Sequence, residues 1–286
     1  MKWTTNKLTD LASEIRVDLK SRKDEFTALL ISDAHWDHPQ HQAKRYKRVI
    51  DEAVELGAPI IYNGDTLCLM QSTRDRRATK GTTKAEHDEQ DYFRAVAVDF
   101  VEEHRHAAAN VALIGYGNHE TAPLKHCNVD PVRMLADQFQ RLTGAKPIVG
   151  GYRGWILFRV FRSGKGQGGG VRLYYFHGAG GGGPVTKGVI QTARRNAFID
   201  GADIIWTGHV HERWLVDTPT IACSQNGVES VRTRWHLSTP GFKEEFAGAK
   251  KGWHVERGAP PKPIGAAWLK IFQDRDQIAT EIRWTR

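Results

Sequence analysis

The sequence predicts an α/β protein built from two packed β-sheets with helices on the outside. Short apolar runs alternate with helix-like segments through most of the chain, a pattern typical of strands that lie parallel in one sheet. After residue 211, strand-like pieces follow one another with few helical signals. This change of pattern predicts a second sheet that packs against the first.

Five apolar runs, rich in β-branched or aromatic residues, are predicted to be buried strands. They are FTALLIS at 26–32, APIIYNG at 58–64, NVALIGYG at 110–117, VRLYYF at 171–176 and ADIIWTG at 202–208. Helix-like segments at 39–57 and 83–108 separate the first three runs, and another at 188–201 precedes the fifth. The first of these segments starts with Pro39 and stops at Gly57, which are common residues at helix starts and ends.

The remaining segments are predicted to be rich in β-structure. Residues 154–176 form two strand-like runs around a glycine-rich turn, which predicts a hairpin. Further strand-like pieces lie at 213–223, 231–239, 266–272 and 277–284. We expect a single domain over residues 1–286, in which the segment 212–286 completes the second sheet.

The composition is that of an ordinary globular protein. Of the 286 residues, 40% are hydrophobic and 26% are charged, which allows a substantial core. The three cysteines are widely spaced without a C-x-x-C motif, so neither a disulfide framework nor a structural zinc site is indicated. No stretch approaches the ~18 apolar residues of a membrane span, and the N-terminal segment lacks the apolar core of a signal peptide. We therefore expect a cytoplasmic protein without membrane contact.

The chain carries 41 basic and 33 acidic side chains, a net charge of +8. This balance favours a polyanionic partner such as DNA or RNA. Solubility alone accounts for it equally well. The oligomeric state is not predicted.

Residues able to bind metal follow every one of the five apolar runs. In chain order they are Asp33 and His35, Asp65, Asn118 with His119 and Glu120, His177, and His209 with His211. Ligand sites in open α/β sheets form at the carboxyl ends of strands. Any one of these residues alone is more often a helix cap or an ordinary surface imidazole, but five coincidences favour one shared site.

The residue types also indicate which metals fit. Carboxylate, imidazole and amide oxygen together favour Mn²⁺, with Fe, Zn²⁺, Mg²⁺, Ni²⁺ and Co²⁺ as alternatives, over Ca²⁺ or thiophilic metals. Seven candidate ligands exceed the ~4 to 6 positions of one ion, so two divalent ions are expected. D-x-H and H-x-H place two ligands two residues apart, which alternate strand side chains would bring to one side.

In order, the five pieces are DAH at 33–35, GD at 64–65, GNHE at 117–120, HG at 177–178 and GHVH at 208–211. This set resembles the calcineurin-like metallophosphoesterases, whose pattern runs D-x-H, G-D, G-N-H-[DE], H and G-H-x-H. The resemblance covers roughly residues 26–215 and is specific, because five separate pieces agree. The segments around the pieces are similar to phosphoesterases carried in phage and prophage genomes, which implies a bacterial or phage-infected host cell.

The resemblance implies a four-layer αββα sandwich, two mixed β-sheets flanked by helices, with a role for each motif residue. One ion would be held by Asp33, His35 and His211. The other would be held by Asn118, His177 and His209, with Asp65 as the bridge. His119 would stabilise the transition state or protonate the leaving oxygen.

The implied activity is that of a dinuclear metal-dependent phosphoesterase. It would hydrolyse phosphodiester bonds of nucleic acid or nucleotides by attack of a hydroxide that bridges the two ions. A phosphomonoesterase or pyrophosphatase on small nucleotides, and a non-catalytic binding scaffold, are the alternatives. The segment GDTLCLM lacks the V-D-R-G continuation of Ser/Thr protein phosphatases, which argues against that activity.

One position departs from the family pattern. Many members read G-D-x-x-D, and in phosphoprotein phosphatases the second Asp hydrogen-bonds the catalytic His; here Cys68 stands in its place. A thiol is a weak acceptor and cannot orient an imidazole as a carboxylate does. We therefore expect His119 to take its orientation from elsewhere or to act with a lower pKa.

Substrate contacts are predicted from three features near the motifs. The loop at 70–84 brings the cations of Arg74, Arg76 and Arg77 toward the crevice, where they would grip phosphates or simply be solvated. Lys187 follows the glycine-rich stretch 178–184 and would bind a substrate phosphate. Trp36 would stack on a base or cap the core. Asp37, His38 and His41 are predicted to support the ligands, start a helix and lie on the surface, respectively.

Overall fold

The computed structural model describes residues 2–70, 83–87, 90–162, 166–183, 185–246, 253–256, 258–275 and 277–286. Thirteen strands form two sheets in this part of the chain. The first sheet has seven strands in the order β1-β2-β7-β8-β9-β11-β10. They are β1 (Lys2–Lys7), β2 (Ala12–Leu19), β7 (Arg153–Arg162), β8 (Gly166–Phe176), β9 (Ile204–Thr207), β10 (Trp214–Cys223) and β11 (Glu229–Ser238).

The second sheet has six strands in the order β13-β12-β3-β4-β5-β6. They are β3 (Glu25–Ile31), β4 (Ile60–Tyr62), β5 (Val111–Ile114), β6 (Ile148–Val149), β12 (Ala267–Asp274) and β13 (Gln277–Trp284). Strands β3 to β6 run parallel, whereas β12 and β13 add antiparallel neighbours, so this sheet is mixed. The seven-stranded sheet is mixed too, since β8, β9 and β11 are parallel and β7–β8 is an antiparallel hairpin.

The two sheets pack face to face because successive strand residues point to opposite faces. In β3, Ala28 and Leu30 lie in the core between the sheets, while Leu29 and Ile31 face the helices. In β9, Trp206 lies in the inter-sheet core and Ile205 faces the other way. A strand buried on both faces reads as a continuous apolar run, which is how the sequence shows these strands.

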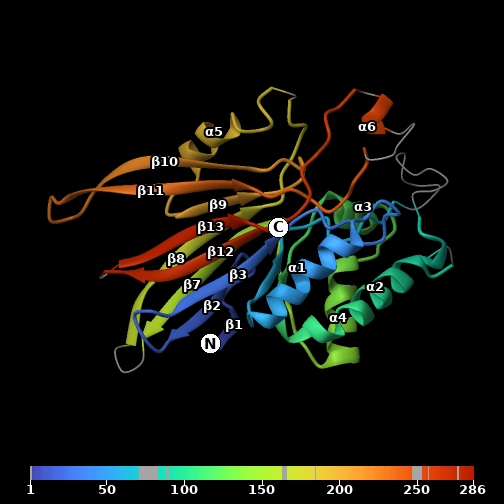
Figure 1. The fold of residues 1–286 in the computed structure, drawn as a ribbon, viewed down its shortest axis with the longest axis horizontal. Coiled ribbons are helices and arrows are strands. Elements are labelled where there is room, and N and C mark those ends of the chain that lie inside the picture. The colour runs from blue at the N-terminus through green and yellow to red at the C-terminus, as the bar shows by residue number, and fades with distance from the viewer. Residues whose placement is uncertain are drawn as a thin grey trace.

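Helices cover the outer face of each sheet, as Figure 1 shows. The six-stranded sheet is covered by α1 (Ala43–Glu55), α2 (Tyr92–Glu103) and α4 (Pro131–Thr143), whose apolar residues share its outer core. The helix α5 (Gln191–Phe198) lies on the seven-stranded side, where Ile199 packs with Tyr174 and Ile205. The predicted fold class, two mixed sheets flanked by helices, is confirmed.

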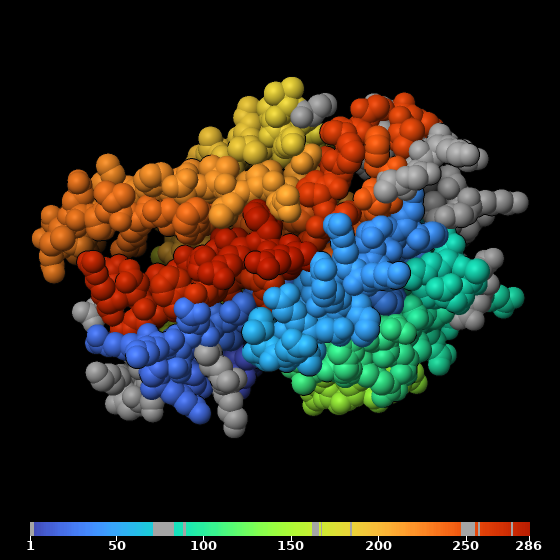
Figure 2. Space-filling view, viewed as in Figure 1, coloured from blue at the N-terminus to red at the C-terminus, as the bar shows by residue number. Residues whose placement is uncertain are grey.

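Several predicted elements need correction. The polar segment 2–19 forms the hairpin β1–β2, whose apolar signal is weak because β1 is an edge strand and β2 buries only alternate residues. The C-terminal segment divides between the sheets: β10 and β11 join the seven-stranded sheet, and β12 and β13 join the six-stranded one. The β10–β11 hairpin extends from one end of the molecule (Figure 2).

The helices differ from the predictions in number and length. The segment 39–57 is helical only over α1, and 83–108 contains α2 between the short 3₁₀ helices η1 (Ala85–His87) and η2 (Arg105–Asn110). Helices α3 (Asn118–His126), α4 and the short α6 (Trp253–Glu256) were not predicted. The signals for α4 are present, because Asp130 caps its N-terminus, Pro131 follows, and Gly144 ends it in a left-handed conformation.

No helix in the described part of the chain is long and apolar enough to cross a membrane.

Candidate metal centre

All five motif pieces lie at the carboxyl ends of parallel strands. Strands β3, β4 and β5 of one sheet and β8 and β9 of the other each end just before a candidate ligand. Three compact groups result, each with its ligand atoms within 4.8 Å of one another, and the third contains His35, Cys68 and His119. The first consists of Asp33, His35 and His211, and the second of Asp65, His177 and His209.

Close contacts hold each group together. In the first group, His211 Nε2 lies 3.3 Å from His35 Nε2 and 3.4 Å from Asp33 Oδ1. In the second group, His177 Nε2 lies 3.2 Å from Asp65 Oδ2. The two groups adjoin, since His177 Nε2 is also 4.0 Å from Asp33 Oδ1. This spacing brings ligand atoms from both sheets around one small volume.

The backbone at these ligands is unusual. Five of the seven candidates have positive φ angles: Asp33 at 54°, His35 at 46°, Asp65 at 48°, His209 at 70° and His211 at 53°. For residues other than glycine this conformation costs about 1–2 kcal/mol each and concentrates at functional sites. The D-x-H and H-x-H pairs therefore converge through left-handed loop backbone, and the predicted strand alternation is not the cause.

Buried atoms without hydrogen-bond partners identify where cations fit. Among the described residues, these atoms include Nδ1 of His35 and Oδ1 of Asn118. The Asn118 side chain follows Gly117 and precedes His119, whose backbone N–H donates to Asp65 Oδ1 over 2.9 Å. A buried acceptor without a hydrogen-bond partner destabilises the folded state, and a bound metal ion would supply the missing partner. The donor set of carboxylate, imidazole and amide oxygen fits divalent ions.

Glycines in the motifs permit this close packing. A Cβ at Gly117 would collide with the Asp65 carboxylate, and one at Gly208 would collide with Ser32 and the Asp33 carboxylate. The requirement for glycine before Asn118 and before His209 is therefore steric.

Glu120, quoted within the GNHE motif but given no role, has a structural one here. Its buried carboxylate accepts hydrogen bonds from the backbone N–H groups of Asp65 at 3.0 Å, Leu67 at 3.0 Å and Gly117 at 2.8 Å. It thereby joins the loop after β4 to the start of α3. The acidic fourth position of the motif was the available signal.

His119 lies at the edge of the second group. Its Nε2 is 3.8 Å from Asp65 Oδ2, and its ring stands edge-on to that of His35 with centroids 4.8 Å apart. Its Nδ1 bonds the backbone carbonyl of Cys68. Because a carbonyl only accepts, Nδ1 carries the hydrogen, and Nε2 is directed to the metal centre.

The charges of the ligand side chains are strongly coupled to one another. Burial raises the pKa of Asp33 to about 7, against the opposing effect of His177. Burial also favours neutral Asp65, but the positive charge of His177 outweighs it and holds the pKa of Asp65 well below its ordinary value. The two carboxylates in turn overcome burial and raise the pKa of His177 to about 10. Burial lowers the pKa values of His35 and His211, which leaves neutral rings with free lone pairs.

The predicted substrate contacts have different outcomes. Arg74, Arg76 and Arg77 lie outside the described residues. Lys187 is exposed with a φ of 47°, and its carbonyl accepts a hydrogen bond from Trp214 Nε1 at 3.0 Å. A Cβ at Gly182 would contact both Lys187 and Val210, so this loop lies beside the GHVH segment.

Trp36 and His41 are core residues. Trp36 is only 8% exposed, its Nε1 donates to Asp99 Oδ2 over 2.7 Å, and rings on several sides enclose it. Of its two predicted roles, capping the core is the one that the structure supports, since its faces are not free for a base. His41 is buried and its Nδ1 bonds the Ala34 carbonyl at 2.8 Å, so its predicted surface position is wrong.

Lys243 is a cation near the site that the sequence did not reveal. It follows β11, and its ammonium lowers the pKa values of His38 and His211 after the larger effect of burial. The nearby Gly241 packs against the backbone of Asp33, and Phe242 N–H donates to the Asp33 carbonyl over 2.9 Å. No motif marks this segment, because backbone contacts determine its position.

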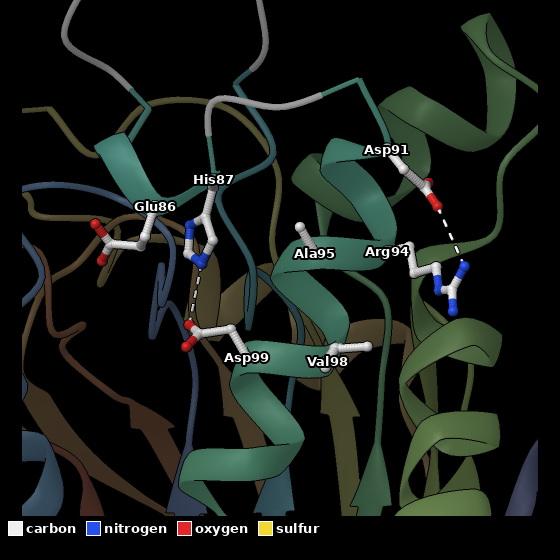
Figure 3. A pocket seen from close by; sticks show the side chains of 7 residues that line it. All are labelled: Glu86, His87, Asp91, Arg94, Ala95, Val98 and Asp99. Atoms are coloured by element: carbon white, nitrogen blue, oxygen red, sulfur yellow. Dashed lines mark hydrogen bonds and ion pairs between the residues drawn. The ribbon is translucent and has the colours of Figure 1, made fainter.

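A pocket of about 480 Å³ lies apart from the candidate metal centre, between η1 and α2 (Figure 3). His87 Nε2 faces Asp99 Oδ2 at 3.1 Å there, and Arg94 faces Asp91 at 3.7 Å. None of the candidate ligands lines it.

No protein-family model and no curated protein matches the sequence. Among solved structures, vacuolar protein sorting 29 from Cryptosporidium parvum is 13% identical with a TM-score of 0.34, over 91% of this chain and 97% of that chain. The protein TM1076 of Thermotoga maritima is 13% identical with a TM-score of 0.33, over 91% and 99% of the two chains.

A third structure, Vps29 from Entamoeba histolytica complexed with Zn²⁺, is 9% identical with a TM-score of 0.29, over 91% and 100% of the two chains. Scores at this level carry no assignment of family or function, so the fold and site described above stand on the geometry of this chain.

Proposed function

We propose that this protein is a dinuclear metal-dependent phosphoesterase that hydrolyses phosphodiester bonds of nucleotides or nucleic acid. One observation carries the proposal: two adjoining groups of ligand atoms, one around Asp33 and one around Asp65, lie beside an imidazole nitrogen of His119. The motif residues that resemble metallophosphoesterases all belong to this one cluster or flank it.

The ions would be held by the two groups, with Asp65 between them. When bound, they would lower the pKa of a water and neutralise phosphate charge. Asp33 and Asp65 supply two formal negative charges against four positive ones, so the occupied centre keeps a net positive charge that favours a phosphate.

His119 is placed to protonate the leaving oxygen. Its Nδ1–H is held by the Cys68 carbonyl, which fixes the ring while Nε2 faces the site. A proton on Nε2 can pass to the leaving oxygen as the P–O bond breaks, whereas the Nδ1 proton stays in place. The neutral rings of His35 and His211 remain available as ligands during this step.

Preference for a diester is supported by the net charge of +8 and by the cations beside the site. Lys187 lies beside the GHVH segment and Lys243 follows β11 near His211. Lys243 is paired with Glu245, so the exposed Lys187 is the proposed contact for a second phosphate along a strand or for the non-bridging oxygens of a single one.

The test begins with the metal-free protein. Calorimetric titration with Mn²⁺ should show two sites, and both should be lost or weakened in Asp65→Asn. Turnover is then compared on bis-nitrophenyl phosphate, the matching monoester, single-stranded DNA and duplex DNA, with His119→Ala as the control that keeps the ligands. Turnover of the monoester alone would replace the diester proposal by a phosphomonoesterase or pyrophosphatase. Metal binding without turnover of any substrate would indicate a binding scaffold.

A further inference from the structure

Three groups hold the buried carboxylate of Asp37. Its Oδ1 accepts the backbone N–H of Cys68 at 2.5 Å, and its Oδ2 accepts the backbone N–H of Leu69 at 2.9 Å and the hydroxyl of Tyr92 at 2.6 Å. The side chain is fully enclosed. Three donors on one carboxylate are the partners of an ionised, acceptor-only group.

One peptide group connects this carboxylate to His119. The carbonyl of Cys68 and the N–H of Leu69 belong to the same peptide unit. The carbonyl accepts the Nδ1–H of His119, and the N–H donates to Asp37. A negative charge at the N–H end of a peptide polarises its carbonyl, and hydrogen bonds in such a chain strengthen one another.

The backbone at this peptide is held under strain. Leu69 has a φ of 51°, a left-handed conformation that costs about 1–2 kcal/mol for a residue with a branched side chain. This conformation persists while the Leu69 N–H bonds Asp37 and the Cys68 carbonyl bonds His119. The strained conformation thus directs the N–H of this peptide to Asp37 and its carbonyl to His119.

We propose that Asp37 is the positioning residue for His119 and acts through the Cys68–Leu69 peptide, an arrangement that we name the peptide relay. The carboxylate that many related enzymes would carry at position 68 is replaced here by a carboxylate one peptide away. The relay fixes the Nδ1–H form of His119 and directs Nε2 to the substrate. This inference rests on the proposed function for its catalytic consequence but not for the state of the ring.

The Cys68 Sγ lies within 4.8 Å of ring nitrogens of His35 and His119, but the relay predicts that this side chain is dispensable for orientation. Cys68→Ala keeps the carbonyl and should keep the relay, so it is the matched control. Asp37→Asn nearly preserves shape but places an NH₂ group against an N–H donor, and it removes the charge. Tyr92→Phe removes one hydrogen bond from Asp37 and leaves both peptide contacts, so its effect should fall between these two.

The state of the ring is measured on the metal-free protein. Histidine ¹⁵N spectra, with the His119 signals assigned from a His119→Gln sample, should show Nδ1 protonated in the wild type and in Cys68→Ala. Asp37→Asn should show a mixture of both ring forms. A coupling between His119 Nδ1 and the Cys68 carbonyl carbon, recorded in the wild type, is the check that needs no variant. Absence of that coupling, or an unchanged ring in a folded Asp37→Asn, overturns the relay.

Kinetics then separates positioning from simple loss of structure. Asp37→Asn should lower kcat on a phosphodiester with an alkyl leaving group about tenfold more than on one with a nitrophenolate leaving group, because only the poor leaving group depends on the proton from His119. KM and bound metal should stay near the wild-type values. Equal losses on both substrates, together with metal loss, contradict a positioning role. If the wild type hydrolyses neither substrate, the proposed function fails while the spectra still decide the relay.

Discussion

The two sheets contribute to the candidate metal centre in different ways. On the six-stranded side, two buried carboxylates, Asp37 and Glu120, each accept three hydrogen bonds and fix the loops after β3, β4 and β5. On the seven-stranded side, contacts across the sheets hold the ligands: His177 Nδ1 bonds the Asn63 carbonyl at 2.7 Å, and His209 N–H bonds Asp33 Oδ2 at 2.9 Å. The six-stranded side is therefore held by hydrogen bonds within itself, and the seven-stranded side is held by contacts to the six-stranded side.

This difference predicts which ligands keep their positions in the absence of metal. A ligand supported by buried hydrogen bonds keeps its position without a metal, whereas a ligand aligned by contacts to other ligands depends on the centre being assembled. His209 fits this view, because its backbone N–H donates to the ligand Asp33. Substitutions on the six-stranded side should therefore lower the free energy of unfolding, whereas substitutions on the seven-stranded side should mainly weaken metal binding.

The largest effect is expected at the residue shared by both halves. Asp65→Asn keeps an oxygen for the His119 N–H but removes the charge that faces His177 and His119. Turnover should fall more than about 10³-fold, and bound metal should fall with it. Metal analysis and steady-state rates provide the measurement, with Asp91→Asn in the separate pocket as the control. Near wild-type activity in Asp65→Asn would remove the basis for the metal centre.

The second prediction compares bracing with ligation. Glu120→Ala leaves three backbone N–H groups of the six-stranded half without their acceptor, each costing about 1 kcal/mol or more. Urea unfolding of the metal-free protein should therefore show a loss of about 3 kcal/mol. His209→Ala should weaken metal binding and change the free energy of unfolding by less than about 1 kcal/mol. Equal losses of stability in the two variants would contradict the proposed contrast.

The third prediction uses acid to test the helix layer of the six-stranded half. His104 donates from Nδ1 to the Phe100 carbonyl and accepts the hydroxyl of Tyr46 at Nε2 over 2.8 Å. Burial lowers its pKa to about 3, so the folded state keeps it neutral while the unfolded state takes up a proton below about pH 6.5. Its contribution to stability is therefore complete above pH 6.5 and is lost as the pH falls toward 3.

The slope of that loss is about 1.4 kcal/mol for each pH unit. In His104→Gln the free energy of unfolding of the metal-free protein, measured by urea, should fall by about 2 kcal/mol less between pH 7 and pH 5 than in the wild type, because the slope acts over the ~1.5 pH units below 6.5. His106 contributes to the lowered pKa of His104 and pairs with Asp51, so it is left unchanged in both proteins. A wild-type slope in His104→Gln would place the acid-sensitive group elsewhere.

The sequence indicates the candidate ligands and a supporting role for Asp37, but it does not reveal which groups Asp37 and Glu120 hold, for a physical reason. Asp33, His35 and His177 follow apolar strands directly, so strand ends and residue type suffice to find them. Asp37 and Glu120 act on backbone N–H groups about 30 and 50 positions away, and no local pattern records such a pairing. Lys243 reaches the site because β11 pairs with β9, which only the sheet order reveals.

The smallest effect is expected at the exposed rim of the seven-stranded half. Lys187→Ala should raise KM for a diester about two- to fivefold and leave kcat unchanged, because an exposed ammonium contributes at most about 1 kcal/mol to binding a phosphate. Lys23 is the matched control, because it lies in the turn before β3, at the end of that strand away from the candidate ligands. The KM effect should shrink as salt rises from 50 to about 300 mM, since exposed charges are screened. A fall in kcat at constant KM would instead assign Lys187 to the chemical step. The seven-stranded side would then contribute to catalysis as well as to substrate binding.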